Sequence, residues 1–290
     1  MATLPLDSTH PDYASVHPIV KAIYEAAGGR DEFEVNIPII LRTAIDEVID
    51  TPRTGRFLLE QTEKTEKTYL GTKVEILVRA FLKFSKGSVL DMNVKGAEVD
   101  IKNTMGTNWS IPRENVGRPA LLIRSSEAKS LCDIGVAVLH DGYLNPGQNQ
   151  DAKRGVSAAG AANIWWMLRQ HPYPVNFWQL LSDSQRKALI NAGGGSARIA
   201  ALFEMVQGRP ISRVQIQGLA RQLDYMKRIR RNGGARDILA PKGIAIFSGV
   251  YDQEPIKHLG LGLVTREEFI SYTPKSTDEV SYLRRIGHID

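Results

Sequence analysis

The stretch KGAEVDIKNT, residues 95–104, places charged residues at every second position of an otherwise apolar run. If it is a strand, Glu98, Asp100 and Lys102 project from one face and the apolar residues between them from the other. Such a charged row is costly to bury unless its members have partners. One interpretation is a solvated strand face on which Glu98 and Lys102 form ion pairs. The other is a functional site.

Two further acids favour the site. Asp91 lies nine residues before Asp100 across a Lys-Gly turn, so a hairpin can bring the two carboxylates together. Glu75 lies sixteen residues before Asp91 on a predicted helix and can reach the same place. Two or three carboxylates plus a strand carbonyl, such as that of Ile101, make an oxygen site that suits Mg²⁺.

Such a site predicts phosphodiester chemistry. A bound Mg²⁺ ion can activate a water and neutralise the charge that develops on a phosphodiester. Lys102, beside the ion, can hold the attacking water and stabilise that charge. The acid-x-lysine triplet alone is weak, since residues 127–129 and 151–153 repeat it without a second acid on a preceding strand.

The surrounding sequence predicts an α/β (α+β) domain. Helical spacing marks residues 16–29, 37–51 and 72–84. Short alternating or β-branched runs follow at 88–94, 97–103, 119–126 and 132–140, which predicts a four-stranded mixed sheet and a domain ending near residue 165. We expect Trp165 and Trp166 on a packing helix and His171 in a linker.

Composition limits the class of protein. The 290 residues are 42% hydrophobic and 24% charged, as in globular proteins with one or two domains. No apolar run approaches the roughly 20 residues that span a bilayer, and the N-terminus lacks the features of a secretory signal. With one cysteine, Cys132, no internal disulfide can form. We expect a cytoplasmic protein without a membrane partner.

The second half is basic. Residues 171–290 carry 17 Lys/Arg against 11 Asp/Glu, which favours a polyanion partner. Residues 217–236 predict a helix-turn-helix whose second helix enters a major groove, with the strand at 243–249 in a wing. A solvated basic helix is the alternative. Because Gly193–Gly195 lack the Gly-Lys-Ser/Thr ending of a phosphate-binding loop, we expect no nucleotide partner. The candidate DNA-binding residues are Arg221, Lys227, Arg228, Arg230, Arg231 and Arg236.

Several separated blocks carry a family resemblance. The blocks EKTEKTYLGTKVEI (63–76), D-x8-DIK (91–102), IPRENVG (111–117), NQDAKR (149–154) and DYMKRIRRNGGAR (224–236) resemble, in order and spacing, the NaeI family of restriction endonucleases. The resemblance covers roughly residues 37–270. It implies a PD-(D/E)xK restriction-endonuclease-like mixed sheet flanked by helices over residues 1–168. A mostly helical, winged-helix-like DNA-binding domain would occupy residues 175–290.

The resemblance also implies site residues. Asp91 and Asp100 would be metal ligands, Lys102 would serve the attacking water, and Glu75 would complete the acidic cluster, with Glu98 outside the core motif. Residues 44–50 match a family stretch that is similar to a DNA-ligase motif. Val48 stands where a ligase carries its reactive lysine, so ligase chemistry there is excluded and a core position is expected.

The function implied is that of a Mg²⁺-dependent type II restriction endonuclease. Such an enzyme would cut both strands of a G/C-rich palindrome such as GCCGGC as a homodimer, since symmetric sites suit symmetric proteins. A second copy of the site, bound by the basic domain, would activate cleavage. Two alternatives remain: a non-catalytic DNA-binding regulator and a DNA nickase of the mismatch-repair type.

Overall fold

The computed structural model describes residues 5–222 and 224–290, which divide into two compact units. Unit 1 runs through Ile49 and resumes over Leu58–Asn176, and unit 2 consists of Asp50–Phe57 and Phe177–Asp290. The segment 50–57 was expected in the first domain. It forms the short helix α3 (Thr51–Thr54), which packs on α8 (Arg213–Ala220) within unit 2.

A five-stranded sheet, one strand more than predicted, forms the centre of unit 1. Its order is β1-β2-β3-β4-β7, and only the β2–β3 pair is parallel. The bounds of its strands are Met92–Val94 (β1), Ala97–Thr104 (β2), Pro119–Ser126 (β3), Leu131–Val138 (β4) and Trp165–Pro172 (β7). The mixed sheet flanked by helices confirms the predicted fold class.

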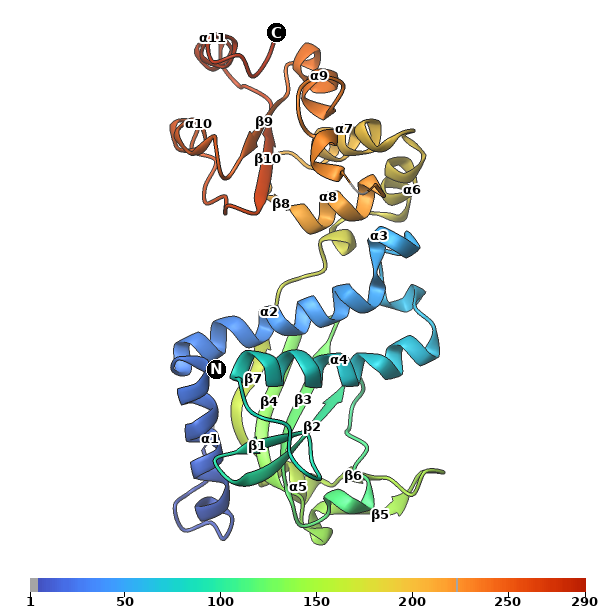
Figure 1. Ribbon diagram of the computed structural model, residues 1–290, viewed down its shortest axis with the longest axis vertical. Coiled ribbons are helices and arrows are strands. Elements are labelled where there is room, and N and C mark those ends of the chain that lie inside the picture. The colour runs from blue at the N-terminus through green and yellow to red at the C-terminus, as the bar shows by residue number, and fades with distance from the viewer. Residues whose placement is uncertain (1–4, 223) are drawn as a thin grey trace. The chain divides into compact units, whose positions relative to one another are not determined.

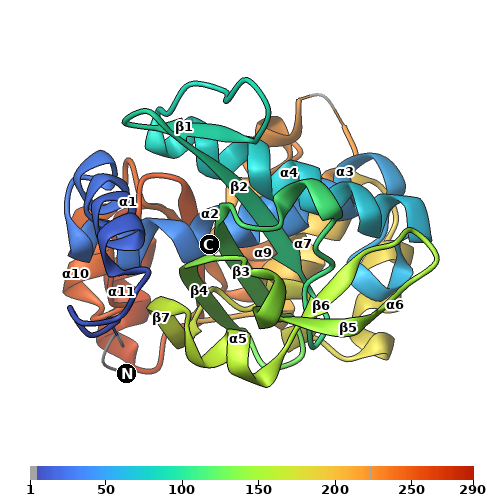
Figure 2. The same ribbon diagram turned by 90° about the horizontal axis from the view of Figure 1, so that it is seen from below.

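Each face of this sheet is covered by its own set of elements (Figures 1 and 2). The three long helices α1, α2 and α4 bury the larger core on one face. A smaller core lies between the other face and the segment that holds β5, β6 and α5. These elements span Tyr13–Ala27 (α1), Arg30–Ile49 (α2), Lys64–Leu82 (α4), Leu144–Gln148 (β5), Arg154–Val156 (β6) and Ala158–Ala162 (α5).

The long helices confirm the helical spacing seen in the sequence. α1 ends at Gly28, whose φ of 93° places it in the left-handed region that glycine adopts readily. α4 begins at a capping box in which the Glu63 backbone N–H donates to the Glu66 carboxylate. Val48 on α2 is buried in the core, as predicted.

The two tryptophans correct the sequence-based expectation. Trp165 and Trp166 begin strand β7 rather than a packing helix. Successive strand residues face opposite sides, so Trp166 is buried in the smaller core and Trp165 packs against the larger one. His171, expected in a linker, is also in β7 and pairs with Cys132. The side chains of this segment alternate with the two-residue period of a strand and not with the 3.6-residue period of a helix.

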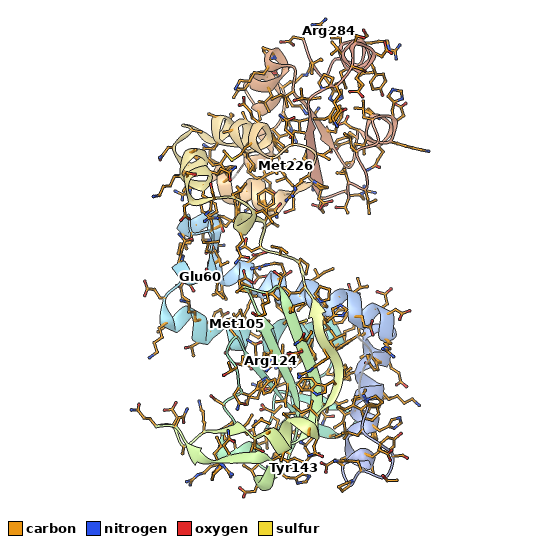
Figure 3. All side chains as sticks on the ribbon, turned by 180° about the vertical axis from the view of Figure 1, so that it is seen from behind. Glu60, Met105, Arg124, Tyr143, Met226 and Arg284 are labelled. Carbon is orange, nitrogen blue, oxygen red and sulfur yellow. The ribbon has the colours of Figure 1, made fainter. Side chains whose placement is uncertain are left out.

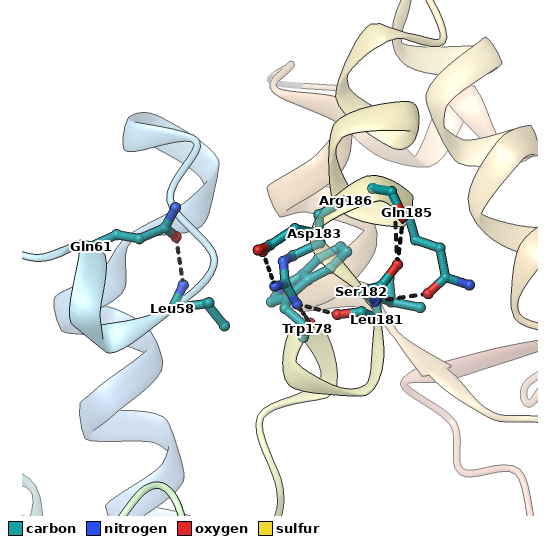
Figure 4. A network of polar contacts seen from close by, with 9 residues as sticks. Leu58, Gln61, Trp178, Leu181, Ser182, Asp183, Gln185 and Arg186 are labelled. Carbon is teal, nitrogen blue, oxygen red and sulfur yellow. Dashed lines mark hydrogen bonds and ion pairs between the residues drawn. The ribbon is translucent and has the colours of Figure 1, made fainter.

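Unit 2 begins with helices and ends in a small sheet. Ser182 caps α6 in a capping box with Gln185, and the Arg186 guanidinium donates to the Trp178 carbonyl at 2.6 Å (Figure 4). β8, β10 and β9 form a three-stranded antiparallel sheet in that order. The main elements are η4 (Phe177–Leu180), α6 (Asp183–Asn191), α7 (Gly195–Met205), β8 (Ile211–Ser212), α8, β9 (Ala245–Ser248), α10 (Gln253–His258), β10 (Glu268–Tyr272) and α11 (Thr277–Arg285).

The second helix expected within residues 217–236 is not one regular α-helix. α8 ends at Arg221 in the left-handed conformation, and the chain continues as the 3₁₀ turn η5 (Tyr225–Arg228) and the short helix α9 (Ala235–Leu239). Residue 223 lies outside the described residues. Positive φ angles at Asn232 and Gly233 stop any helix between η5 and α9. Lys227 lies in η5, whereas Arg230 and Arg231 lie in the turn that follows it.

None of the helices in the described ranges is both long enough and apolar enough to cross a membrane.

Candidate active site

A tight hairpin turn brings the two predicted aspartates together. Lys95 and Gly96 both have positive φ, as a type I′ turn requires. Strand β1 pairs with β2 so that Met92 lies opposite Val99. Continuing this antiparallel register by one residue places Asp91 opposite Asp100, and their carboxyl groups are in hydrogen-bond contact. The turn chemistry thus sets the geometry of the acidic pair.

Asp91 also accepts a hydrogen bond from the backbone of β2. The Ile101 N–H donates to Asp91 Oδ2 at 2.7 Å. In an extended strand the N–H and C=O of one residue point to the same edge, so the Ile101 carbonyl is directed toward Asp91. Hydrogen bonds from Asp100 and from this N–H outweigh burial and lower the pKa of Asp91. Asp91 is therefore an anion at neutral pH.

Asp100 is the most deeply buried acid of the cluster, with 3% of its surface exposed. Its Oδ2 lies 2.7 Å from Lys102 Nζ, two residues along the same strand face. Asn115, from the turn before β3, donates its side-chain N–H to the same oxygen. Burial, assisted by the contact with Asp91, raises the pKa of Asp100 to about 6. The solvated-face interpretation fails, because Lys102 pairs with Asp100 and not with Glu98.

Glu75 joins the cluster from helix α4. Burial and the neighbouring Asp91 charge raise the pKa of Glu75 to about 7. Arg79, one turn later, lies 3.5 Å from the Glu75 carboxylate and donates to the Asp91 carbonyl at 3.0 Å. Asn115 and Arg79 were not predicted, because neither is one of the charged residues of β2 or one of the acids spaced before it. Only the tertiary contacts reveal them.

The donor set fits a magnesium ion. Within residues 5–222 and 224–290, no three or more His, Cys, Asp or Glu side chains are arranged to hold a metal by themselves. Mg²⁺ does not need such a closed shell, since it is usually held by one or two carboxylates, with water and substrate phosphate completing an octahedron. Asp91, Asp100 and the Ile101 carbonyl would supply such protein ligands at one edge of β2, with Glu75 beside them.

The Glu98 carboxylate is hydrogen-bonded to the loop that leads to the acidic cluster, not to the cluster itself. Its carboxylate accepts hydrogen bonds from Ser88 N and Oγ, Val89 N and Leu90 N, at 2.5 to 2.9 Å. These donors lower its pKa to about 2. A Cβ on Gly87 would come within 2.7 Å of the same carboxylate, so the loop approaches Glu98 closely. Glu98 thereby fixes the residues immediately before Asp91.

The predicted DNA-binding residues are distributed over unit 2 in different surroundings. The Arg221 guanidinium packs against Gly55, and Lys227 pairs with Asp224 at 2.9 Å. Arg230, Arg231 and Arg236 line a common cavity, and Arg228 is half-buried in η5. Sequence reasoning missed Arg213, which lines that cavity from the start of α8.

A mixed sheet flanked by helices, with acids and a lysine at the edge of β2, defines a restriction-endonuclease-like protein. A family model described as Restriction endonuclease NaeI matches residues 31–279. The Type II restriction enzyme NaeI of Lentzea aerocolonigenes is 34% identical over an alignment of 232 residues, which covers 77% of this chain and 73% of that protein. The chain belongs to the NaeI family of restriction endonucleases.

Family membership confirms the resemblance and the prediction that the chain is a restriction endonuclease. The alternatives, a non-catalytic regulator and a mismatch-repair nickase, are set aside on the same finding.

Proposed function

We propose that the chain is a Mg²⁺-dependent type II restriction endonuclease that hydrolyses both strands of duplex DNA at a short palindrome. The observation that supports this most is the convergence of the Asp91 and Asp100 carboxylates with the Lys102 amine at one edge of β2. Their residue types and spacing suit phosphodiester hydrolysis.

The ion would be held by Asp91, Asp100 and the Ile101 carbonyl. When bound, it would activate water and neutralise the charge that develops on the scissile phosphate. Asp91 and Asp100 would carry the negative charge that attracts the ion. Glu75 lies beside Asp91, where it can accept a proton or a hydrogen bond from a water molecule. Oxygen donors favour a hard cation over Zn²⁺ or Cu²⁺, and the small number of protein ligands, with water completing the shell, suits Mg²⁺.

Lys102 and Asn115 have separate tasks. The Lys102 ammonium can move from Asp100 to orient the attacking water and stabilise charge on a phosphate oxygen. Asn115 donates to Asp100 and, being 2% exposed, holds that carboxylate in place rather than contacting DNA. Fixing a carboxylate from behind preserves the geometry that catalysis needs.

Unit 2 supports a second DNA contact. The order α7, β8, α8, η5, α9, β9, α10 and β10, with β10 central in the small sheet, supports a winged-helix-like domain in which α8 and α9 would be the helix-turn-helix. Arg221, Lys227, Arg228, Arg230, Arg231 and Arg236 would supply its cationic contacts. A second site bound there would activate cleavage, with a coupling of about 1–3 kcal/mol. A homodimer would match the palindrome, for which GCCGGC is the proposed type.

Digestion of a fully sequenced plasmid with Mg²⁺, followed by mapping of the ends, tests the proposal. We expect double-strand ends at one recurring palindrome and no cleavage by Lys102→Ala. A plasmid with one site should be cut slowly, and a short uncut duplex that carries the site should accelerate cleavage. Nicks in one strand only, or cleavage without divalent ions, would contradict the proposal. If the added duplex only competes, the activation by a second site is wrong.

A further inference from the structure

The basic segment of unit 2 encloses a cavity of about 440 Å³. Its walls come from η5 and the following turn, from α9, and from strands β9 and β10 of the small sheet. A volume of this size is typical of small-molecule sites, which are mostly apolar with a few convergent polar groups. A DNA-backbone contact needs exposed cations only, so this half-open cavity with buried apolar lining residues suits a further ligand.

The floor of the cavity is apolar. Ile229 and Phe269 are 2% and 4% exposed, and Met226 (Figure 3) is half-buried beside them. Tyr251, in the turn after β9, stands at the cavity with 86% of its surface exposed. A large aromatic ring so exposed is available to stack on a planar group, as aromatic side chains do on nucleic-acid bases.

The rim of the cavity is cationic. Arg213 is paired with Glu267 at 3.0 Å, and Arg236 is paired with Asp252 at 3.0 Å. Arg230 and Arg231 are exposed, and neither forms an ion pair within 4 Å among the described residues. Lys227, which is paired with Asp224, and to a smaller extent Arg230 lower the pKa of that acid. The cavity therefore carries an excess of about two positive charges. A phosphate monoester, at about −1.5 to −2 near neutral pH, matches that excess.

The geometry points to a nucleoside monophosphate as the ligand of this cavity. The base would lie on the apolar floor under Tyr251, and the phosphate would accept hydrogen bonds from Arg230 and Arg231. The sequence lacks a phosphate-binding loop, and for that reason no nucleotide partner was expected. Such a loop serves nucleoside triphosphate hydrolysis, so its absence does not limit what this cavity can bind. The nucleotide can come from solution as a phosphate monoester, or from bound DNA as a nucleotide turned out of the stack, whose phosphodiesters each carry one negative charge. Only the second source rests on the proposed function.

Titration calorimetry without Mg²⁺ or DNA tests the first source, with 2′-deoxyguanosine 5′-monophosphate and inorganic phosphate as the probes. We expect the nucleotide to bind at least about tenfold more tightly than inorganic phosphate, because only the nucleotide uses the apolar floor. Tyr251→Ala should weaken nucleotide binding about 5- to 150-fold and leave phosphate binding unchanged. Arg230→Gln with Arg231→Gln should weaken both. Arg266→Gln, an exposed arginine outside the cavity, is the matched control.

A duplex carrying 2-aminopurine tests the second source. Its fluorescence should rise when the probe base leaves the stack on binding, and Tyr251→Ala should remove the rise without preventing binding. Either source supports the proposal. It is overturned if the nucleotide binds no better than phosphate and the duplex shows no rise, because the cavity is then an ordinary phosphate clamp. The titration needs no cleavage activity, so failure of the proposed function leaves its result readable. Thermal melting shows whether each variant remains folded.

Discussion

In unit 1 the charges around β2 are buried or half-buried and contact one another, whereas in unit 2 Arg230 and Arg231, after η5, are exposed at a cavity rim. Asp100 has both Lys102 and Asn115 as partners, while Arg230 and Arg231 have no ion-pair partner among the described residues. Burial makes position critical, since an unpaired buried charge is costly. Exposed arginines keep their conformational freedom and can adapt to a ligand. The difference suits chemistry in one unit and binding in the other.

The largest effect should come from the centre of the acidic cluster. Asp100→Asn keeps the shape of the side chain but removes a charge that holds the metal, and cleavage should fall about 10³-fold, or about 4 kcal/mol in activation free energy. DNA binding measured with Ca²⁺ should stay within about tenfold. Asp31→Asn, an exposed acid on α2, is the control and should cut normally. Near-normal cleavage by Asp100→Asn would remove the acidic cluster from the mechanism.

Burial can be compared directly through two ion pairs of similar length. Arg42 and Glu127 are 2.8 Å apart and buried, and Tyr173 Oη also donates to Glu127 at 2.7 Å. Lys242 and Glu204 are 2.7 Å apart and exposed. Glu127→Ala should lower the free energy of unfolding by about 1–3 kcal/mol, because it leaves Tyr173 Oη without its acceptor and the buried Arg42 with Asp46, at 2.8 Å, as its remaining carboxylate. Glu204→Ala should change it by less than about 1 kcal/mol.

Urea unfolding of both variants measures this contrast. Equal losses of stability would show that the two pairs are equivalent and that burial is not the deciding variable.

Glu98 should have an intermediate effect through the loop before Asp91. Glu98→Gln retains the size of the side chain but loses the charge that its four hydrogen bonds stabilise. We expect cleavage or metal affinity to fall about 10- to 100-fold, as for residues that orient metal ligands. Titrating cleavage against Mg²⁺ concentration measures it. Ser88→Ala removes only one of those donors and should do less; an unchanged Mg²⁺ dependence in Glu98→Gln would show that the loop is held without this charge.

The smallest effect is expected from the arginines of unit 2 on duplex binding. Replacing Arg230 and Arg231 with glutamine should weaken binding and reduce the slope of log affinity against log salt by about 2, one for each lost phosphate contact. Filter binding between low and moderate salt measures the slope. Arg209→Gln with Arg266→Gln changes the net charge equally on exposed positions away from the cavity and should leave the slope closer to that of the parent.

The two units also differ in how far sequence reasoning reached. The positions of Glu75, Asp91, Asp100 and Lys102 were predictable because a strand has a fixed period of two and a Lys-Gly turn sets the hairpin. The tryptophans of β7 were misassigned, because a short aromatic run fits either period. The second helix of the basic segment was wrongly predicted, because only residues 225–228 form a 3₁₀ turn and the chain then runs through turns, with left-handed residues at Asn232 and Gly233, before α9 begins.

The sequence by itself determined the charged row on β2, the hairpin that pairs it with Asp91 and the membership in a restriction-endonuclease family. These features depend on local periodicity, turn chemistry and the order of blocks along the chain. Only the tertiary structure decided that Asn115 and Arg79 contact the acidic cluster, that Glu98 holds the preceding loop, and that arginines from several elements meet around one cavity. Such contacts join residues far apart in sequence, and no local period encodes which side chains packing will bring together.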